Sequence, residues 1–389
     1  MNSLNNKLKI CTGLTIIMLA IVFNACKKYE NLDDMVYITG TETDRLAKFT
    51  VEDIPSSFSV TATVTRKLEE DITVHFKVDT SLVSNYNAEM SANYYVPPAG
   101  SYELSSSSTI VRERTNVSDP VTVSITSTDD FMEGRSYMIP VTITEVDGPF
   151  DVLEPSRTIF LRVARVFYFN SVDISDHNFY HTYTFPDNAY PGLNEFTYEI
   201  KCYVDSWHSG NPPISRLSNW GPPDESMFNL LRFGEGGSDI DQLQWINTSG
   251  SVFSNTRFQL KRWYTISCVY DGSKARLYVD GVLDAEFDAE GQVYTFGLLE
   301  LGMSYGGYEY SQRFLGRIAE VRLWNRALSR TEIQAGICGV YSGSPGLVAY
   351  WKLNEGDGQT FYDASGNGYD MVWPNTVVWN SDLDNKCAE

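Results

Sequence analysis

The sequence has little of what zinc proteins, nucleotide-binding proteins and serine hydrolases need. It holds four histidines and six cysteines, and the cysteines form no CxxC pair or Cys/His cluster. It also contains no Walker loop, no dinucleotide-binding glycine motif and no GxSxG. His177 and His181 have the spacing of metal ligands only on a helix, but the residues after them alternate like a strand. The sequence therefore gives no support for any of these three protein classes.

Positive charge is scarce as well. Against 50 acidic residues stand 30 lysines and arginines, which gives a formal net charge of −20. Such a surface repels phosphate backbones and anionic lipid headgroups, so nucleic acid is not an expected partner. Aromatic residues, in contrast, are abundant, with 24 Tyr and 8 Trp. They are typical of β-sandwich cores, and those left on a surface form flat contact platforms.

The N-terminus contains one apolar run that is too short to span a bilayer comfortably. Ile10–Phe23 follows two lysines and leads into FNAC, which ends at Cys26. This pattern resembles a bacterial lipobox, which implies a signal peptide over 1–25 and a lipidated Cys26. The alternative is an ordinary signal peptide with an incidental cysteine. The following ENLDD resembles the acidic stretch of surface lipoproteins of gut Bacteroidetes. We therefore expect a tether over 26–35 and an outer-membrane, lipid-anchored, surface-exposed protein.

Residues 36–165 are predicted to form an immunoglobulin-like β-sandwich. Runs such as FSVTATVTR and PVTVSITS alternate in polarity, and turn-forming clusters separate them. DTSLVSNYNAEM predicts one helix, capped by Asp79, Thr80 or Ser81. The string VDTSLVSNYNAEMSANYYVPPAGSYEL, with YMIPVTI after it, resembles the N-terminal domain of Bacteroidetes surface lipoproteins that include endo-β-N-acetylglucosaminidases. The resemblance implies an accessory domain without known chemistry of its own.

Residues 166–389 are predicted to form a second β-sandwich. RWYTISCVYDGSKARLYVDGVLDAEF places two Asp-Gly turns between alternating runs, which is a strong signal for a meander. Ser329 and Glu332 have capping-box spacing for a short helix ending by Gly336. The residues predicted to face the core of the meander are Ile266, Cys268, Tyr270, Ala275, Leu277 and Val279.

Several motifs of this second domain, in order, resemble the laminin-G/pentraxin-like family of concanavalin A-like jelly rolls. They include FTYEI, YDG, LYVDG and GRIAEVRLWNRALS. GLVAYWKLNEG resembles the closing strand that pentraxins carry after their helix. The expected fold class is therefore all-β, with an immunoglobulin-like sandwich followed by a concanavalin A-like jelly roll.

Four cysteines remain in the second domain, namely Cys202, Cys268, Cys338 and Cys387. They allow three pairings, and buried free thiols are the alternative. Because pentraxins bridge the strands equivalent to FTYEIKC and WYTISC, the resemblance implies a bond from Cys202 to Cys268. Cys338 would then pair with Cys387.

The segment DASGNG offers a candidate calcium loop. Asp363, Ser365 and Asn367 place oxygen-bearing side chains at alternate positions, as in the first half of a calcium-binding loop. The alternative is an Asx/Gly turn. The acid-rich calcium cluster of pentraxins is mostly missing here, so a pentraxin-type double site is not expected. Calcium is the one candidate cofactor.

One carboxylate triplet has the spacing used by concanavalin-type glycanases. Glu286, Asp288 and Glu290 alternate along EFDAE. They follow directly after a hairpin, however, where the laminin-G pattern has an ordinary strand that runs into a surface loop. We expect a protein that is not an enzyme. A glycosidase using Glu286 and Glu290 is the alternative.

Two loops carry aromatic residues that suit a sugar. Flat rings beside Asp, Asn and Gln offer a stacking face and hydrogen bonds to hydroxyl groups. The alternative is that these rings fold back as loop anchors. The candidate residues are Trp207, Trp220, Tyr305, Tyr308 and Tyr310.

These features predict a non-catalytic glycan-binding lipoprotein of a polysaccharide-utilisation system. Its partners would be an oligo- or polysaccharide and the glycan transporter and glycosidases of the same outer membrane. The resemblance of the first domain favours host N-glycans. An adhesion module that binds protein is a third hypothesis.

The lipid anchor is testable at Cys26. Cys26→Ala removes the thiol that carries the acyl chains, and each buried methylene contributes about 0.8 kcal/mol to membrane binding. We expect the variant to leave the membrane fraction on cell fractionation. A variant that stays with the membrane after washing would contradict the anchor.

Overall fold

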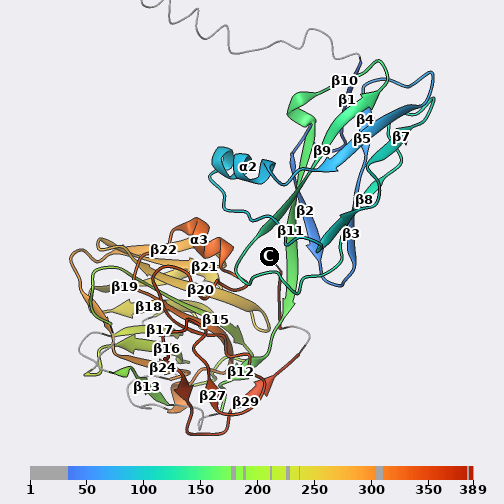
Figure 1. The fold of residues 1–389 in the computed structure, drawn as a ribbon. Coiled ribbons are helices and arrows are strands. Elements are labelled where there is room, and N and C mark those ends of the chain that lie inside the picture. The colour runs from blue at the N-terminus through green and yellow to red at the C-terminus, as the bar shows by residue number, and fades with distance from the viewer. Residues whose placement is uncertain are drawn as a thin grey trace, which may run out of the picture.

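The computed structural model describes residues 34–176, 181–186, 190–210, 213–224, 228–235, 237–303, 310–382 and 385–388. Cys26 lies outside them. Strands dominate, as the sequence predicts, and Figure 1 shows two lobes, each built around a β-sandwich. Among the described residues, no helix has both the length and the apolar character needed to cross a membrane.

The first domain packs one large sheet against two small ones. The large sheet has the order β2-β11-β9-β5-β7, and the small sheets are β10-β1-β4 and β3-β8-β6. Apolar residues from all three sheets form one core, with Val74, Ile139 and Leu161 fully buried. The strands are β1 (Met35–Ile38), β2 (Leu46–Val51), β3 (Ser56–Val60), β4 (Ala62–Val64), β5 (Ile72–Val78), β6 (Tyr102–Leu104), β7 (Ser108–Val111), β8 (Val121–Ile125), β9 (Tyr137–Asp147), β10 (Asp151–Val152) and β11 (Thr158–Tyr168).

The predicted helix of this domain is confirmed as α2 (Leu82–Met90), which begins after Ser81. Val83 and Tyr86 of α2 pack on Met138 of β9 and Phe160 of β11. The helix therefore covers part of the outer face of the large sheet. In Figure 1 it lies on the side of the first domain that faces the second.

The second domain is a jelly-roll sandwich of two larger sheets. One sheet has the order β22-β21-β20-β15-β25-β12-β29 with β26 also on β25, and the other β13-β24-β16-β17-β18-β19. The strands are β12 (Ser171–Asp173), β13 (Thr182–Thr184), β14 (Tyr190–Leu193), β15 (Phe196–Val204), β16 (Ser215–Gly221), β17 (Asn229–Phe233), β18 (Gln242–Asn247), β19 (Gly250–Arg257), β20 (Trp263–Tyr270), β21 (Lys274–Val279), β22 (Val282–Asp288), β23 (Tyr294–Phe296), β24 (Leu298–Leu301), β25 (Gly316–Trp324), β26 (Leu347–Trp351), β27 (Thr360–Phe361), β28 (Met371–Val372), β29 (Val378–Asn380) and β30 (Lys386–Ala388).

The local predictions for this domain are confirmed. All six residues predicted to face inward on the meander lie in its core. The short helix is α3 (Arg330–Ala335), with both hydrogen bonds of the capping box between Ser329 and Glu332. The closing strand is β26, which pairs with β25.

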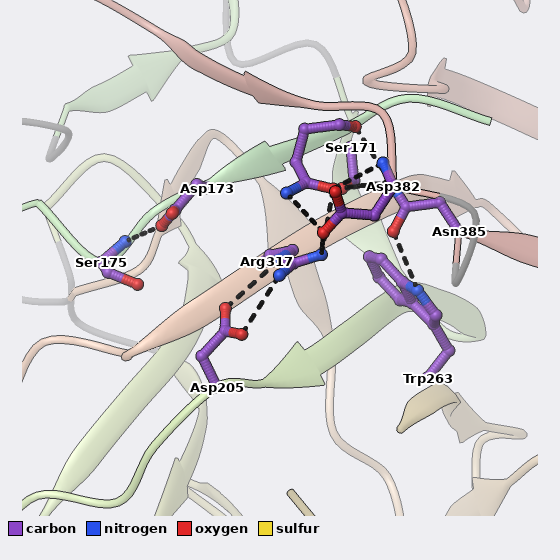
Figure 2. Close-up of polar contacts among 9 residues, drawn as sticks. Ser171, Asp173, Ser175, Asp205, Trp263, Arg317, Asp382 and Asn385 are labelled. Carbon is purple, nitrogen blue, oxygen red and sulfur yellow. Dashed lines mark hydrogen bonds and ion pairs between the residues drawn. The ribbon is translucent and has the colours of Figure 1, made fainter. Parts of the chain in front are cut away.

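The C-terminal tail returns to the first domain. Its strand β30 pairs antiparallel with the end of β11, although we predicted all of 166–389 to belong to the second domain. Just before β30, the buried Asn385 donates to Ser171 Oγ at 3.0 Å and accepts from Trp263 Nε1 at 3.2 Å, as Figure 2 shows. The tail thus connects both sandwiches.

An arginine secures the chain that leads into this tail. Arg317 of β25 donates to both carboxylate oxygens of Asp205, each at 3.3 Å, and to Asp382 at 3.1 Å (Figure 2). It also donates to Asn380 Oδ1 at 2.9 Å. Burial raises the pKa of Asp205 even though Arg317 acts in the opposite direction. The carboxylates of Asp205 and Asp382 hold the guanidinium group of Arg317 in one orientation. Because Asp382 lies where the tail begins, the same contacts position the start of the tail.

The cysteines follow one of the two predicted pairings. Cys338 and Cys387 are bonded, as predicted, and this bond ties the segment after α3 to β30. The predicted bond between Cys202 and Cys268 is wrong, since both are buried free thiols. In the register of β15 and β20, Cys202 lies opposite Tyr264 and Cys268 opposite Tyr198. Four residues of strand, about 13 Å, therefore separate them, far beyond the reach of a disulfide.

Removal of the disulfide should destabilise the protein. The bonded cysteines are 49 residues apart, and a loop of this length corresponds to about 4 kcal/mol of chain entropy in the unfolded state. We expect the variant carrying Cys338→Ser and Cys387→Ser to unfold at lower urea concentration, with a loss of about 2–4 kcal/mol. As a control, a reductant should lower the midpoint of the wild type and leave that of the double variant unchanged. A wild-type midpoint that is insensitive to reductant would contradict the expectation.

Candidate functional site

Trp220, one of the five residues predicted to stack on a sugar, is a core residue. It lies in β16, opposite Asn229 and Leu299, and exposes 1% of its surface. Its ring stacks on Tyr198 with 4.0 Å between centroids. A β-bulge between Arg216 and Ser218 interrupts the alternation of this strand, which is why the sequence there resembles a loop. The assignment of Trp220 to a glycan site is therefore wrong.

The other predicted aromatic residues do not form a site among the described residues. Trp207 is half-buried and packs against Phe233, with 5.4 Å between ring centroids. Trp207 thus serves as a loop anchor, the alternative that we considered. Tyr305 and Tyr308 lie outside the described residues, and Tyr310 begins the 3-10 turn η4 (Tyr310–Gln312). Their role in glycan binding stays a prediction.

The DASGNG loop is fastened to β26 by its own polar groups. Asp363 Oδ1 accepts from the backbone N–H groups of Tyr350 and Ser365, at 2.9 and 3.0 Å. Its Oδ2 accepts from Ser365 Oγ at 2.8 Å and from the N–H of Tyr369 at 3.1 Å. Asn367 Nδ2 donates to the carbonyl of Val348 at 2.8 Å. As arranged, these groups fit an Asx-type turn better than a cation site, and calcium binding stays a prediction.

The carboxylates of the glycosidase alternative lie on an edge strand. Glu286 of β22 is exposed and ion-paired with Lys274 at 2.6 Å and Arg276 at 3.3 Å. The hydrogen bond from Lys274 lowers the pKa of Glu286. Glu290 is exposed beyond the end of the strand. A general acid of a glycosidase requires a raised pKa, so this environment does not favour the alternative.

A cleft between the two domains joins aromatic and polar side chains. It has a volume of about 600 Å³ and lies between the segment that follows α2 and the segment 324–345 of the second domain. We call it the interdomain cleft. Its aromatic and polar lining includes Asn93, Tyr94, Tyr95, Arg135, Arg162, Trp324, Arg326, Glu332, Gln334 and Tyr341.

The first-domain wall is ordered by backbone and amide hydrogen bonds. Asn87, near the end of α2, donates to the carbonyl of Tyr94 at 2.8 Å and accepts from its N–H at 2.9 Å. The N–H of Tyr95 then donates to the carbonyl of Ser136 at 2.9 Å. This anchoring places both tyrosines beside the turn that leads into β9.

Two buried cationic side chains donate hydrogen bonds to the segment that forms the second-domain wall of the cleft. Lys201 Nζ donates to the carbonyl of Ile337 and Arg322 Nη1 to that of Gly336, both at 2.8 Å. Burial lowers the pKa of Lys201 to about 8, while nearby carboxylates act in the opposite direction. These bonds position the chain that carries Tyr341.

Arg135 bridges the two walls. Its guanidinium carbon lies 4.4 Å from the ring centroid of Tyr95 and 5.2 Å from that of Tyr341. Beside it the domains touch closely, because a Cβ added at Gly134 would lie 2.2 Å from the backbone nitrogen of Tyr341. Gly134 has φ of +69°, so both its conformation and its surroundings require glycine.

The comparisons with known proteins agree with this two-domain architecture. Residues 177–334 match the model of the concanavalin A-like lectin/glucanases superfamily, and residues 29–149 match the model of a family of N-terminal domains. The chain therefore combines these two domain types. No curated protein matches the sequence.

Among solved structures, one similar protein comes from Bacteroides ovatus ATCC 8483, and carbohydrate binding has been ascribed to it. It is 21% identical, the alignment covers 89% of this chain and 97% of that chain, and the TM-score is 0.59. A heptameric SAP-like pentraxin from Limulus polyphemus is 13% identical over 57% of this chain and 94% of its own, with a TM-score of 0.36. Bacteroides thetaiotaomicron EndoBT-3987, solved with a Man5GlcNAc product, is 16% identical over 33% of this chain and 30% of its own, with a TM-score of 0.28. The first likeness shows a shared overall fold.

The residues of the interdomain cleft were not identified from the sequence. The adjacent Tyr94 and Tyr95 in ANYYVPP are a usable signal, because two neighbouring rings cannot both enter the core of one sandwich from an extended chain. Tyr341, between two glycines in GVYSG, has no such signal. Only the fold brings it within reach of Arg135.

The calcium prediction can be tested by thermal unfolding. Calcium that binds only the folded DASGNG loop should raise the melting temperature by mass action. We expect a higher melting temperature in millimolar calcium than in chelator, and no comparable change with magnesium, which prefers a more rigid octahedral site. Identical melting curves in calcium and chelator would leave the loop as a turn.

Proposed function

We propose that the protein is a non-catalytic glycan-binding lipoprotein that holds saccharides in the interdomain cleft. The observation that carries the proposal is the cleft itself, where the exposed Tyr341 and the half-buried Tyr94 and Tyr95 stand beside amide and guanidinium groups. A sugar ring needs an apolar face to stack on and polar groups for its hydroxyls, and this lining offers both. The carbohydrate binding ascribed to the similar protein from Bacteroides ovatus supports the same class of ligand.

The lipobox at Cys26 supports a lipid anchor in the outer membrane, with the cleft at the cell surface. In that position the protein would capture glycans for a transporter and glycosidases of one polysaccharide-utilisation system. Weak binding would be sufficient. A millimolar dissociation constant corresponds to about 4 kcal/mol, and many anchored copies on one polymer increase the effective affinity. Host N-glycans are one candidate ligand, from the resemblance of the first domain.

Tyr341 offers the sharpest test of the cleft. It exposes 38% of its surface, and its replacement by alanine removes a stacking face. We expect Tyr341→Ala to weaken binding by about 1–2 kcal/mol, a ten- to thirtyfold loss, when measured by calorimetric titration with a glycan selected on an array.

Tyr362→Ala is the matched control, because Tyr362 is 61% exposed and lies outside the cleft lining. It should bind like the wild type and keep the wild-type melting curve. Tyr341→Ala should still unfold in one cooperative transition, at a temperature lowered only by the loss of its contact with Arg135. Full affinity in Tyr341→Ala would move the site elsewhere. Hydrolysis of the glycan that is lost in Glu286→Gln would favour the glycosidase alternative, and capture of a protein without any glycan binding would favour the adhesion module.

A further inference from the structure

The interdomain cleft is positively charged, although the chain as a whole is strongly acidic. The ionisable residues of its lining, apart from tyrosines, are Arg135, Arg162, Arg326 and Glu332, so three positive charges face one negative charge. Lys48, directly beside Arg162 in the register of β2 and β11, adds a further positive charge next to the lining. A chain with a net charge of −20 thus keeps a local excess of about +2 in this cleft.

Two of these arginines lack a carboxylate partner. Arg326 is paired with Glu332 at 2.8 Å. Within the part of the chain that the structure describes, the guanidinium groups of Arg135 and Arg162 make no hydrogen bond or ion pair. Elsewhere in the same protein, Arg317 and Arg322 each hold two carboxylates. Most arginines of this chain are paired with a carboxylate, and Arg135 and Arg162 are among the exceptions.

The contacts of Arg135 leave its donors available. A guanidinium stacks on aromatic rings through its flat faces, while its N–H groups point outward in the plane. The rings of Tyr95 and Tyr341 therefore orient Arg135 without using its hydrogen-bond donors. Arg162 comes from the middle of β11, opposite Met138, so its backbone is fixed by strands on both sides. Arg135 lies in the segment that leads into β9.

We infer that Arg135 and Arg162 form a recognition site for an acidic sugar, one whose ring carries a carboxylate. The inference rests on the proposed function and names the class of glycan that the cleft selects. The planar fork of arginine matches a carboxylate with two parallel hydrogen bonds. The neighbouring tyrosines and the amides of Asn93 and Gln334 would hold the uncharged part of the same sugar. A uronic acid and a sialic acid share this chemistry.

Pairs of ligands that differ only in their charge test the inference. The probes are trigalacturonic acid with its carboxyl-reduced form, and sialyllactose with the methyl ester of its sialyl carboxylate, each titrated calorimetrically into the wild type. We expect at least one acidic member to bind about ten- to a hundredfold more tightly than its neutral partner, because charge-assisted hydrogen bonds are the stronger ones. The preference should shrink when the ionic strength rises from about 0.05 M to about 0.5 M.

Arg162→Gln should abolish this preference, because it removes a cation that pairs with none of the residues that the structure describes. The matched control is Arg114→Gln, which changes the same charge at a residue whose side chain is 87% exposed and outside the cleft lining. It should keep the preference. Both variants should unfold at the same urea concentration as the wild type. Arg135→Gln is a less specific test, because this substitution would also remove the contact of Arg135 with Tyr341 of the second domain.

The remaining outcomes separate the inference from the function. Equal affinity for charged and neutral members would overturn the acidic-sugar site and leave glycan binding intact. A preference that survives in Arg162→Gln would place the recognition of charge elsewhere and overturn the inference. Tight binding of sulfated galactose without binding of either carboxylated probe would overturn the assignment to carboxylates. No binding of any saccharide, on the array or in titration, would remove both proposals.

Discussion

The bond between Cys338 and Cys387 is the constraint on which the arrangement of the two domains depends. The strand that carries Cys387 pairs with β11 of the first domain, while Cys338 belongs to the segment that lines the interdomain cleft in the second. Without the returning tail and this link, the two sandwiches, which have separate cores, would be joined by the short connection between β11 and β12 and by side-chain contacts such as that of Lys352 with Glu133. Domains joined in that way are expected to move relative to each other. The covalent link therefore maintains the cleft as a defined site.

Buried charges on the outer face of the β15–β25 sheet support the same segment. Arg322, Glu199 and Glu320 are all buried, and Tyr350 donates its hydroxyl to Glu320 at 2.6 Å. Charges removed from water are costly, and their mutual attraction offsets this cost only with good geometry. This network also positions the segment after α3, because Arg322 donates a hydrogen bond to the carbonyl of Gly336. The network fixes the chain behind Tyr341, so a conservative apolar replacement would keep the volume but lose the alignment.

The sequence was informative where a pattern repeats over one strand or one turn. The Asp-Gly meander, the capping box at Ser329 and the closing strand all follow from neighbouring residues, and all are confirmed. It misled us where a bulge breaks the alternation, as at Trp220, and where a resemblance was carried across a register that differs, as at Cys202. The interdomain cleft lies beyond such reasoning. Tyr95 and Tyr341 are 246 positions apart (341 minus 95), and the packing of the two domains places both rings against Arg135.

The cleft also changes the role expected of the first domain. A resemblance to accessory domains implies a spacer, yet Tyr94, Tyr95, Arg135 and Arg162 give this domain one whole wall of the cleft. The acidic surface around it has a further effect on selection. A net charge of −20 repels anions over most of the molecule, so an acidic sugar gains affinity only where arginines reverse the local field. A neutral sugar is neither repelled nor attracted by these charges, and its binding would rely on stacking and on hydrogen bonds to its hydroxyl groups. Repulsion outside the cleft and attraction within it would thus act together, and an acidic glycan would bind in one place and in one orientation rather than along the whole surface.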